Sequence, residues 1–250
     1  MTRSFSPENP AHIGILKHSG EGALLCYRTA LLAGIERLGA HSYPTLTMSG
    51  RALAHSTEMW DAMDLAGLRA LFHEDCEVLA RAGADFAILP DNTAHIALEF
   101  AADPLPLPFL HIGEVVAEHA SQLGFKKVGI LGTNWTMEGP VYPGALGRRG
   151  IDYAIPELEM RQRLHNHIMD EFCQGIFTDE AVRAYEQAAS DLAAAGCDAV
   201  AAVCTEIPII LTDENSPVPV IDSTRLLARE AVAVAVGDRA MPQWRGGPVV

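Results

Sequence analysis

The chain has 250 residues, of which 32 are Asp or Glu and 18 are Lys or Arg, so its formal net charge is −14 at pH 7. This length allows two domains with separate cores. The acidic excess argues against binding to nucleic-acid phosphates. No apolar run is long enough to cross a membrane, and residues 1–10 lack a signal-peptide pattern. Five cysteines, an odd number, fit free thiols. We expect a cytoplasmic protein without nucleic-acid or membrane partners.

The first hundred residues alternate short β-rich runs with longer segments of helical periodicity. Residues 12–16 are predicted to form a strand and residues 23–38 a helix, because apolar residues there recur every three or four positions. A second helix is predicted over 68–82, ending before Gly83. The run 86–89 has the apolar composition of a buried strand.

The same order returns in the second half of the chain. Residues 127–131 are predicted to form a strand, and a helix is expected after Met137. A long helix is predicted over 179–195, closed by Gly196, and a buried strand over 199–203. Strands that alternate with helices of this length indicate an α/β protein whose parallel sheets are covered on both faces.

The two halves also share sequence. Residues 83–95 are echoed by residues 196–208 at an offset of 113 positions, which makes Asp91 equivalent to Cys204. Such a repeat predicts two similar Rossmann-like lobes with parallel sheets, related by a pseudo-twofold axis. Ligands of open parallel sheets bind beyond the carboxyl ends of the strands. We therefore expect an active site in the cleft between the lobes, where Asp91 and Cys204 would approach one carbon from two faces.

Two groups of prolines interrupt the pattern, one starting at Pro104 and one at Pro217. Proline cannot continue a helix and keeps its predecessor extended, so both groups suggest crossovers between lobes. The predicted first lobe comprises residues 1–104 with 216–250, and the second comprises residues 105–215. Residues 150–167 show the least regular pattern, and residues 241–250 are expected to form a frayed or docked tail.

Cys204 stands at a predicted strand end, where a helix would begin. Helix N-terminal N–H groups favour the thiolate, which is the basic and nucleophilic form of sulfur. The alternative is a buried structural cysteine, because free cysteine is among the most buried residue types. We accept this alternative for the other four cysteines: Cys26, Cys76, Cys173 and Cys197.

Asp91 could simply cap a helix, as Asp commonly does at such junctions. Its equivalence to Cys204 makes a second interpretation competitive: a desolvated carboxylate can rise in pKa and act as an acid or base. Asn92, Thr93 and Thr205 offer side-chain and backbone donors suited to a substrate carboxylate.

Further polar residues follow the predicted strand ends. His95 and Glu206 could tune the protonation of the two reactive positions, or serve as capping residues. Lys17 and His18 add a cation and a titratable ring after the first strand. Ser49 belongs to a segment, residues 45–51, that could equally be a surface loop. The histidines show no metal-ligand spacing, so no metal is expected.

Three motifs resemble one family. Residues 204–208 read Cys-Thr-Glu-Ile-Pro, residues 132–138 read Gly-Thr-Asn-Trp-Thr-Met-Glu and are followed by Tyr142, and a third run spans residues 155–178. From residue 13 to 236 the chain resembles the aspartate/glutamate racemase superfamily, which also includes hydantoin racemase, maleate isomerase and arylmalonate decarboxylase. The third run is most similar to the broad-specificity bacterial amino-acid racemase branch.

The resemblance implies catalysis without pyridoxal phosphate or any other cofactor, by two cysteines that flank the substrate α-carbon. Cys204 matches the second cysteine, whereas Asp91 stands where the family has its first. The resemblance also implies a homodimer and further substrate contacts, which match Asn92, Thr93, Thr205, Thr133 and Thr136. The Lys17–Gly20 segment departs from a glycine-rich turn of the family, which suggests a changed substrate.

These observations favour a racemase or epimerase acting by two-base proton transfer at the α-carbon of an amino acid or related carboxylate. Aspartate and glutamate are the default substrates by resemblance. A carboxylate is ionised at neutral pH unless its pKa is raised, so Asp91 could be a base but a poor acid. The main alternative is therefore a lyase or decarboxylase that uses Cys204 on one face. A binding module without catalysis and an isomerase attacking covalently through Cys204 stay open.

Overall fold

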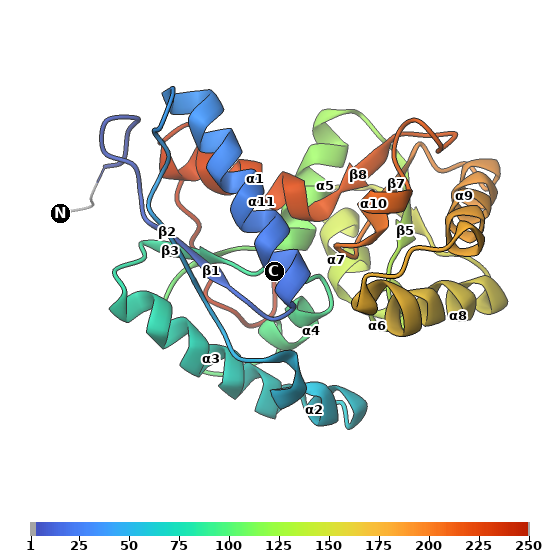
Figure 1. Cartoon of the computed structure of the whole chain (residues 1–250), viewed down its shortest axis with the longest axis horizontal. Coiled ribbons are helices and arrows are strands. Elements are labelled where there is room, and N and C mark those ends of the chain that lie inside the picture. The colour runs from blue at the N-terminus through green and yellow to red at the C-terminus, as the bar shows by residue number, and fades with distance from the viewer. Residues whose placement is uncertain (1–3, 250) are drawn as a thin grey trace. The chain divides into compact units, whose positions relative to one another are not determined.

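The structure, a computed structural model, describes residues 4–249 (Figure 1). The chain divides into two compact units. Unit 1 runs to Ile112 and resumes at Thr224, and unit 2 spans Gly113–Ser223. The sequence suggested divisions at residues 104 and 216. The observed divisions lie later because β4 (Phe109–Leu110) and β8 (Val220–Asp222) follow the prolines and pair into the two sheets before the chain crosses over.

Unit 1 is built on a parallel sheet of order β2-β1-β3-β4. Its other strands are β1 (Ile13–Leu16), β2 (Leu46–Ser49) and β3 (Phe86–Ile88). Helix α1 (Gly20–Leu38) connects β1 to the edge strand β2. Helix α3 (Leu65–Arg81) connects β2 back across the sheet to β3, in the opposite direction. Because parallel crossovers are right-handed, these two helices cover opposite faces. The shorter helices of this unit are η1 (Leu53–His55), α2 (Thr57–Asp61) and α4 (Ala94–Leu98).

The core of unit 1 lies between α3 and the sheet. Leu68, Phe72 and Leu79 recur on one side of α3 and are fully buried with Leu16 and other strand residues. The C-terminal tail docks on this core. The backbone carbonyl of Trp244 accepts a hydrogen bond from the Phe109 N–H at 2.7 Å, and the indole packs against the same cluster. The docked alternative predicted for the tail is confirmed for residues 241–249, and Val250 lies outside the described residues.

Unit 2 repeats the arrangement with a parallel sheet of order β6-β5-β7-β8. Its other strands are β5 (Lys127–Leu131), β6 (Asp152–Ala154) and β7 (Ala199–Ala202). The helices of the second half are α5 (Ile112–Gln122), α6 (Asn134–Glu138), α7 (Val141–Gly147), α8 (Leu158–Asn166), η2 (His167–Glu171), η3 (Phe172–Gln174), α9 (Asp179–Ala194), α10 (Ile207–Ile210) and α11 (Ser223–Ala235). The prediction of an α/β fold with two similar parallel sheets is confirmed.

Two segments differ from the sequence prediction. Residues 150–167, expected to be irregular, contain β6 and α8. β6 is an edge strand whose Asp152 and Tyr153 are exposed, so it lacks the apolar run that marks a buried strand. Residues 45–51 include the edge strand β2 rather than forming a loop. The other predicted strands and helices are present, and their ends differ by a few residues.

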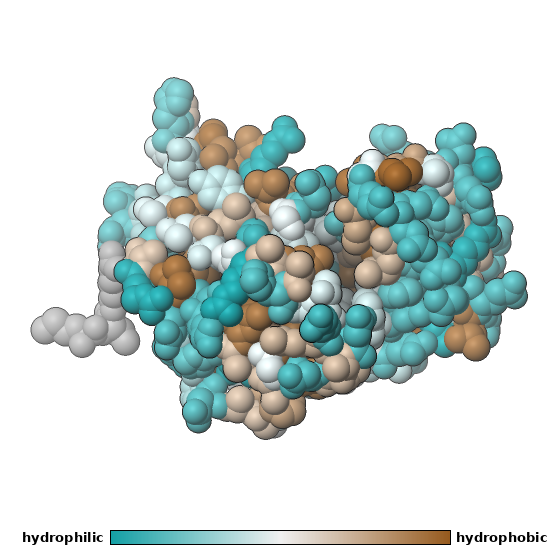
Figure 2. Space-filling model, turned by 60° about the horizontal axis from the view of Figure 1, so that its bottom comes forward, coloured by the Kyte–Doolittle hydropathy of each residue, from teal (hydrophilic) through white to brown (hydrophobic). Residues whose placement is uncertain are grey.

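One face of the molecule is mainly polar. Hydrophilic residues predominate on the face shown in Figure 2, and hydrophobic residues there are scattered among them. Within residues 4–249, no helix combines the length and the apolar character that a membrane span requires.

Candidate functional site

Asp91 lies in the turn after β3, at the carboxyl end of the unit 1 sheet. Its Oδ1 accepts a hydrogen bond from the Ala94 N–H at 3.1 Å, so it does satisfy a donor at the start of α4, as the capping interpretation predicts. Its Oδ2 lies 2.5 Å from Nδ1 of His18, which follows the neighbouring strand β1. The Asp91 side chain is 16% exposed, so the carboxylate keeps limited access to solvent.

His18 is buried behind this carboxylate, with 7% of its side chain exposed. Its Nε2 lies 3.0 Å from the Ser56 hydroxyl and accepts a hydrogen bond from the Trp60 indole N–H at 3.2 Å. The Phe72 ring packs edge-on at 5.3 Å between centroids. The sequence suggested that His18 binds substrate, and the structure adds a direct contact with Asp91.

The environment of Asp91 decides its charge. Burial alone would raise the pKa of Asp91, but His18 and the Ala94 N–H together outweigh burial and hold this pKa below its ordinary value. The carboxylate is therefore ionised at neutral pH. The sequence left open whether the site raises the pKa of Asp91, and the contact with His18, which the sequence could not show, decides against a raised pKa.

His95 holds the main chain of Asp91 rather than its carboxylate. Its Nε2 accepts a hydrogen bond from the Ile112 N–H at 3.2 Å, so its Nδ1 carries the proton and donates to the Asp91 carbonyl at 2.9 Å. Burial, reinforced by the neighbouring His111, lowers the pKa of His95 to about 3. His95 is therefore a neutral ring that fixes the turn after β3.

The remaining candidate residues of unit 1 also lie near the carboxyl ends of its strands. The Lys17 N–H donates to the Ser49 carbonyl at 2.8 Å, which joins the ends of β1 and β2. The Lys17 ammonium donates to the Arg51 carbonyl at 2.8 Å, so part of its donor capacity is already used. Asn92 is buried and Thr93 partly exposed, and both belong to the turn that leads into α4.

In unit 2, Cys204 follows β7 and is partly exposed. Its Sγ–H donates to Oε2 of the buried Glu206 at 3.1 Å, so Glu206 contacts the thiol as the sequence suggested. Thr205, between them, is buried. The helix predicted to begin here, α10, has four residues. A single turn carries a small dipole, so its contribution to thiolate formation is smaller than the sequence suggested.

Thr133 and Thr136 follow the adjacent strand β5. The Thr133 hydroxyl caps α6 by accepting a hydrogen bond from the Thr136 N–H at 3.2 Å, and the two hydroxyl oxygens lie 3.1 Å apart. Both side chains are buried. Because β5 and β7 are neighbouring parallel strands, Thr133 and Cys204 both lie at the carboxyl end of the unit 2 sheet. His18 and Asp91 lie in the same way at the carboxyl end of the unit 1 sheet.

The other four cysteines divide into two groups. Cys26, Cys76 and Cys197 are buried, as predicted, and burial raises the pKa of the Cys76 thiol to about 11. Cys173 is exposed on η3, so its predicted burial is wrong. Across the described residues 4–249, no group of three or more His, Cys, Asp or Glu side chains is placed to hold a metal ion.

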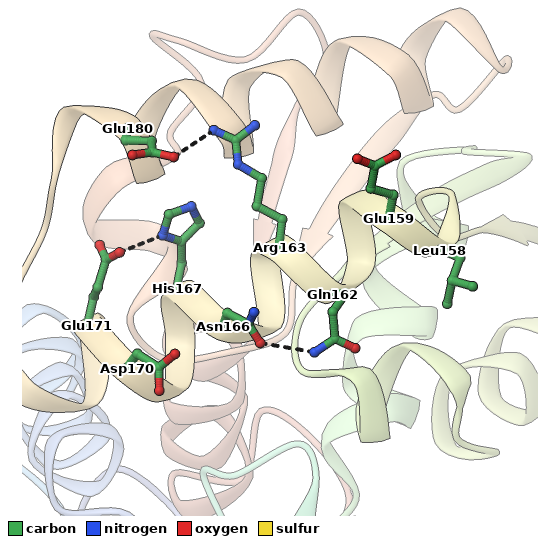
Figure 3. A pocket seen from close by; sticks show the side chains of 9 residues that line it. All are labelled: Leu158, Glu159, Gln162, Arg163, Asn166, His167, Asp170, Glu171 and Glu180. Carbon is green, nitrogen blue, oxygen red and sulfur yellow. Dashed lines mark hydrogen bonds and ion pairs between the residues drawn. The ribbon is translucent and has the colours of Figure 1, made fainter.

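Sequence reasoning missed Ser56 and Trp60, which contact His18 from η1 and α2. It also missed a surface cavity of about 720 Å³ on unit 2, along α8 (Figure 3). Two ion pairs border the cavity, Arg163–Glu180 at 3.2 Å and His167–Glu171 at 2.8 Å. It contains none of the predicted site residues. Nothing in the local spacing of these side chains distinguishes them from an ordinary polar surface.

Comparisons with known proteins give consistent results. The family model described as Asp/Glu/Hydantoin racemase matches residues 27–231. The broad specificity amino-acid racemase RacX of Bacillus subtilis (strain 168) is 28% identical over 163 residues, which cover 62% of this chain and 66% of that protein. Among solved structures, a Yersinia pestis protein assigned as an Asp/Glu racemase has a TM-score of 0.80 at 26% identity. An aspartate racemase homologue from Pyrococcus horikoshii OT3 has a TM-score of 0.74 at 23% identity. Each structural match covers 90% of this chain and 99% of the other.

Proposed function

Because the chain belongs to the Asp/Glu/hydantoin racemase family, we propose that it is a cofactor-independent racemase or epimerase acting at the α-carbon of an amino acid or related carboxylate. The family and the relatives support an enzyme of the amino-acid racemase type. Aspartate and glutamate are the first substrates to test.

One observation carries the assignment of the two catalytic groups. Asp91 follows β3 and Cys204 follows β7, and these strands hold the same place in two sheets of identical strand order. Residues at equivalent positions of two similar units are suited to act on opposite faces of one substrate. In this proposal both units contribute to a single site, with Asp91 on one face of the α-carbon and Cys204 on the other.

The protonation states suit one direction of reaction in the resting enzyme. Asp91 is ionised and removes the α-proton, and the electron pair stays with the substrate as an enolate. Donors from Asn92, Thr93 and Thr205 stabilise the substrate carboxylate. The Cys204 thiol then donates its proton to the opposite face of the α-carbon. The turnover leaves a protonated Asp91 and a Cys204 thiolate, and exchange with solvent restores the starting state.

This scheme makes the two directions unequal in kcat and KM. One enantiomer reacts with the resting form of the enzyme, and the other needs protonated Asp91 with a thiolate at Cys204. Free enantiomers have equal free energies, so kcat/KM must be the same in both directions. The inequality therefore appears only when substrate saturates the enzyme.

The second candidate is a lyase or decarboxylase that protonates a carbanion on one face. The observation that favours it is the lowered pKa of Asp91, against burial, through His18 and Ala94. An ionised Asp91 has no proton to give, which leaves the Cys204 thiol as the proton donor of the pair. Such a reaction changes the mass of the product, whereas racemisation changes only its handedness.

The test uses chiral chromatography and mass analysis of L- and D-aspartate and L- and D-glutamate after incubation with the enzyme. We expect inversion without a change of mass. Cys204→Ser should abolish it, whereas the matched control Cys197→Ser changes a buried thiol outside the proposed site. Product of altered mass supports the lyase or decarboxylase. Equal inversion by Cys204→Ser and wild type contradicts the role of Cys204.

A homodimer and a cytoplasmic location complete the proposal. They rest on the family resemblance and on the odd number of cysteines in the sequence. Light scattering of the purified protein and fractionation of its host cells test them.

A further inference from the structure

Three aromatic rings pack together next to the turn that carries Asp91. His95 is completely buried, and its ring centroid lies 4.7 Å from that of His111 in an edge-to-face arrangement. The Trp244 ring comes from the C-terminal tail. It lies 4.6 Å from His111, also edge-to-face, and 6.3 Å from His95 with the two ring planes 11° apart. Aromatic pairs have preferred relative orientations, so each ring restricts the orientation of the others.

His95 is the member of this cluster that contacts the turn. Its imidazole bridges two main-chain groups, the Asp91 carbonyl at 2.9 Å from Nδ1 and the Ile112 N–H at 3.2 Å from Nε2. Hydrogen bonds weaken steeply when they bend, so a tilt of the ring would weaken both bonds at once. The packing around the His95 ring therefore determines how firmly the Asp91 main chain is held.

Main-chain hydrogen bonds hold the tail in place on unit 1. The Trp244 carbonyl accepts from the Phe109 N–H at 2.7 Å, and the Arg245 carbonyl accepts from the Leu105 N–H at 2.8 Å. The Arg245 guanidinium donates back to the Leu105 carbonyl at 3.0 Å. Trp244 is thus attached through its own main chain and through that of the next residue.

A turn of two glycines fixes the indole from the other side. Gly246 and Gly247 have φ values of +83° and +82°, which favour glycine. A Cβ at Gly246 would also lie 2.7 Å from Nη2 of Arg69. The Gly247 N–H donates to the Leu98 carbonyl at 2.8 Å, and the Gly247 carbonyl accepts from the Trp244 indole N–H at 3.0 Å. The turn therefore orients the indole toward the histidine rings.

We propose that Trp244 is a positioning residue for Asp91, which acts by packing against His95. This inference rests on the proposed function, in which Asp91 is a base. Trp244 orients the His95 ring, His95 holds the Asp91 main chain, and the carboxylate moves with that main chain. A general base must lie within hydrogen-bond reach of the proton that it removes, and a displacement of about 1 Å can lower the rate about 100-fold.

A purely structural role of Trp244 predicts a different result. Trp244 also packs against the core of unit 1, so its removal could lower activity by destabilising the fold. In the proposed scheme Asp91 removes the α-proton of one enantiomer, and Cys204 removes that of the other. A displaced Asp91 slows α-proton exchange of the first enantiomer only. Partial unfolding removes active molecules and slows the exchange of both enantiomers equally.

The activity test measures α-proton exchange in D2O for each enantiomer of aspartate and of glutamate, at saturating substrate. We expect Trp244→Ala to change the ratio of the two exchange rates by about tenfold, against the enantiomer that Asp91→Asn no longer exchanges. Trp244→Phe keeps an aromatic ring and should leave the ratio within about twofold of wild type. The control Gln243→Ala changes an exposed side chain of the same tail and should not alter the ratio. Equal slowing of both enantiomers in Trp244→Ala overturns the inference.

A second measurement does not depend on activity. Amide hydrogen exchange, followed by NMR of the full-length protein, reports on the Ile112 N–H that His95 accepts. We expect Trp244→Ala to accelerate this exchange by about tenfold relative to the Lys17 N–H, which joins β1 to β2. If Trp244→Ala does not fold, Trp244→Leu replaces it in both measurements, because leucine keeps an apolar side chain without a flat ring.

The two measurements separate the inference from the proposed function. Unchanged exchange at Ile112 in a folded variant, or equal acceleration at Ile112 and Lys17, overturns the inference whatever the activity. Absence of racemisation in wild type, together with faster exchange at Ile112 alone in the variant, would refute the proposed function and would still support positioning of the Asp91 main chain by Trp244.

Discussion

Replacing His95 by glutamine should remove a pH-dependent part of the stability of the protein. Burial, with a contribution from His111, lowers the pKa of His95 to about 3 from an ordinary value of 6.5. The unfolded chain therefore takes up a proton at this residue below pH 6.5, whereas the folded protein does so only near pH 3. The contribution of His95 to the free energy of unfolding is therefore at its maximum above pH 6.5, and it decreases as the pH falls toward 3.

The size of the effect follows from this difference. Between the two pKa values, each decrease of one pH unit lowers the free energy of unfolding by about 1.4 kcal/mol. At pH 5.5 the loss relative to pH 7.5 is about 1.4 kcal/mol. Glutamine does not titrate, and its side-chain oxygen can still accept from the Ile112 N–H that His95 now binds.

Urea unfolding of wild type and His95→Gln at pH 7.5 and 5.5 measures the effect. The other histidines are present in both proteins, so the difference between the two pH dependences isolates His95. We expect wild type to lose about 1.4 kcal/mol more than the variant. Equal losses would show that His95 is not a buried neutral ring, and would refute the reasoning about the turn that carries Asp91.

Two further substitutions test the packing around the sheets by urea unfolding. A Cβ added at Gly50 would lie 2.0 Å from the Lys17 carbonyl oxygen, so Gly50→Ala should lower the free energy of unfolding by about 1–3 kcal/mol. A Cβ added at Gly20 has no neighbour within 4 Å, so the control Gly20→Ala should lower it by less than about 0.5 kcal/mol. Equal costs would contradict the close approach. Thr178 caps α9 by accepting from the Ala181 N–H at 3.2 Å, so Thr178→Ala should cost about 1 kcal/mol, and an unchanged stability would contradict the cap.

Most of the fold could be predicted because its signals are local. Apolar periodicity predicts α3 and α9, and buried runs predict β5 and β7, almost to their observed ends. Edge strands carry a weaker signal, since one side lacks a neighbouring strand and polar residues are tolerated there. That is why β2 and β6 escaped prediction.

The site was only partly predictable. The internal repeat identified Asp91 and Cys204, because equivalent positions of the two units are flanked by similar local sequence. No local sequence pattern identifies the partners of His18. Asp91, Ser56 and Trp60 are 73, 38 and 42 positions away in the sequence and contact the ring only after folding. The direction of the pKa shift of Asp91 depends on that contact. The sequence alone therefore left open whether the pKa of Asp91 is raised.

The central claim is that Asp91 and Cys204 act on opposite faces of one α-carbon. Proton NMR in D2O tests it most directly, with each enantiomer of the substrate given separately to Asp91→Asn and Cys204→Ala. We predict that each variant still exchanges the α-proton of one enantiomer, and that the two variants retain opposite enantiomers. Loss of exchange with both enantiomers in one variant, and retention of both in the other, would contradict two-sided chemistry.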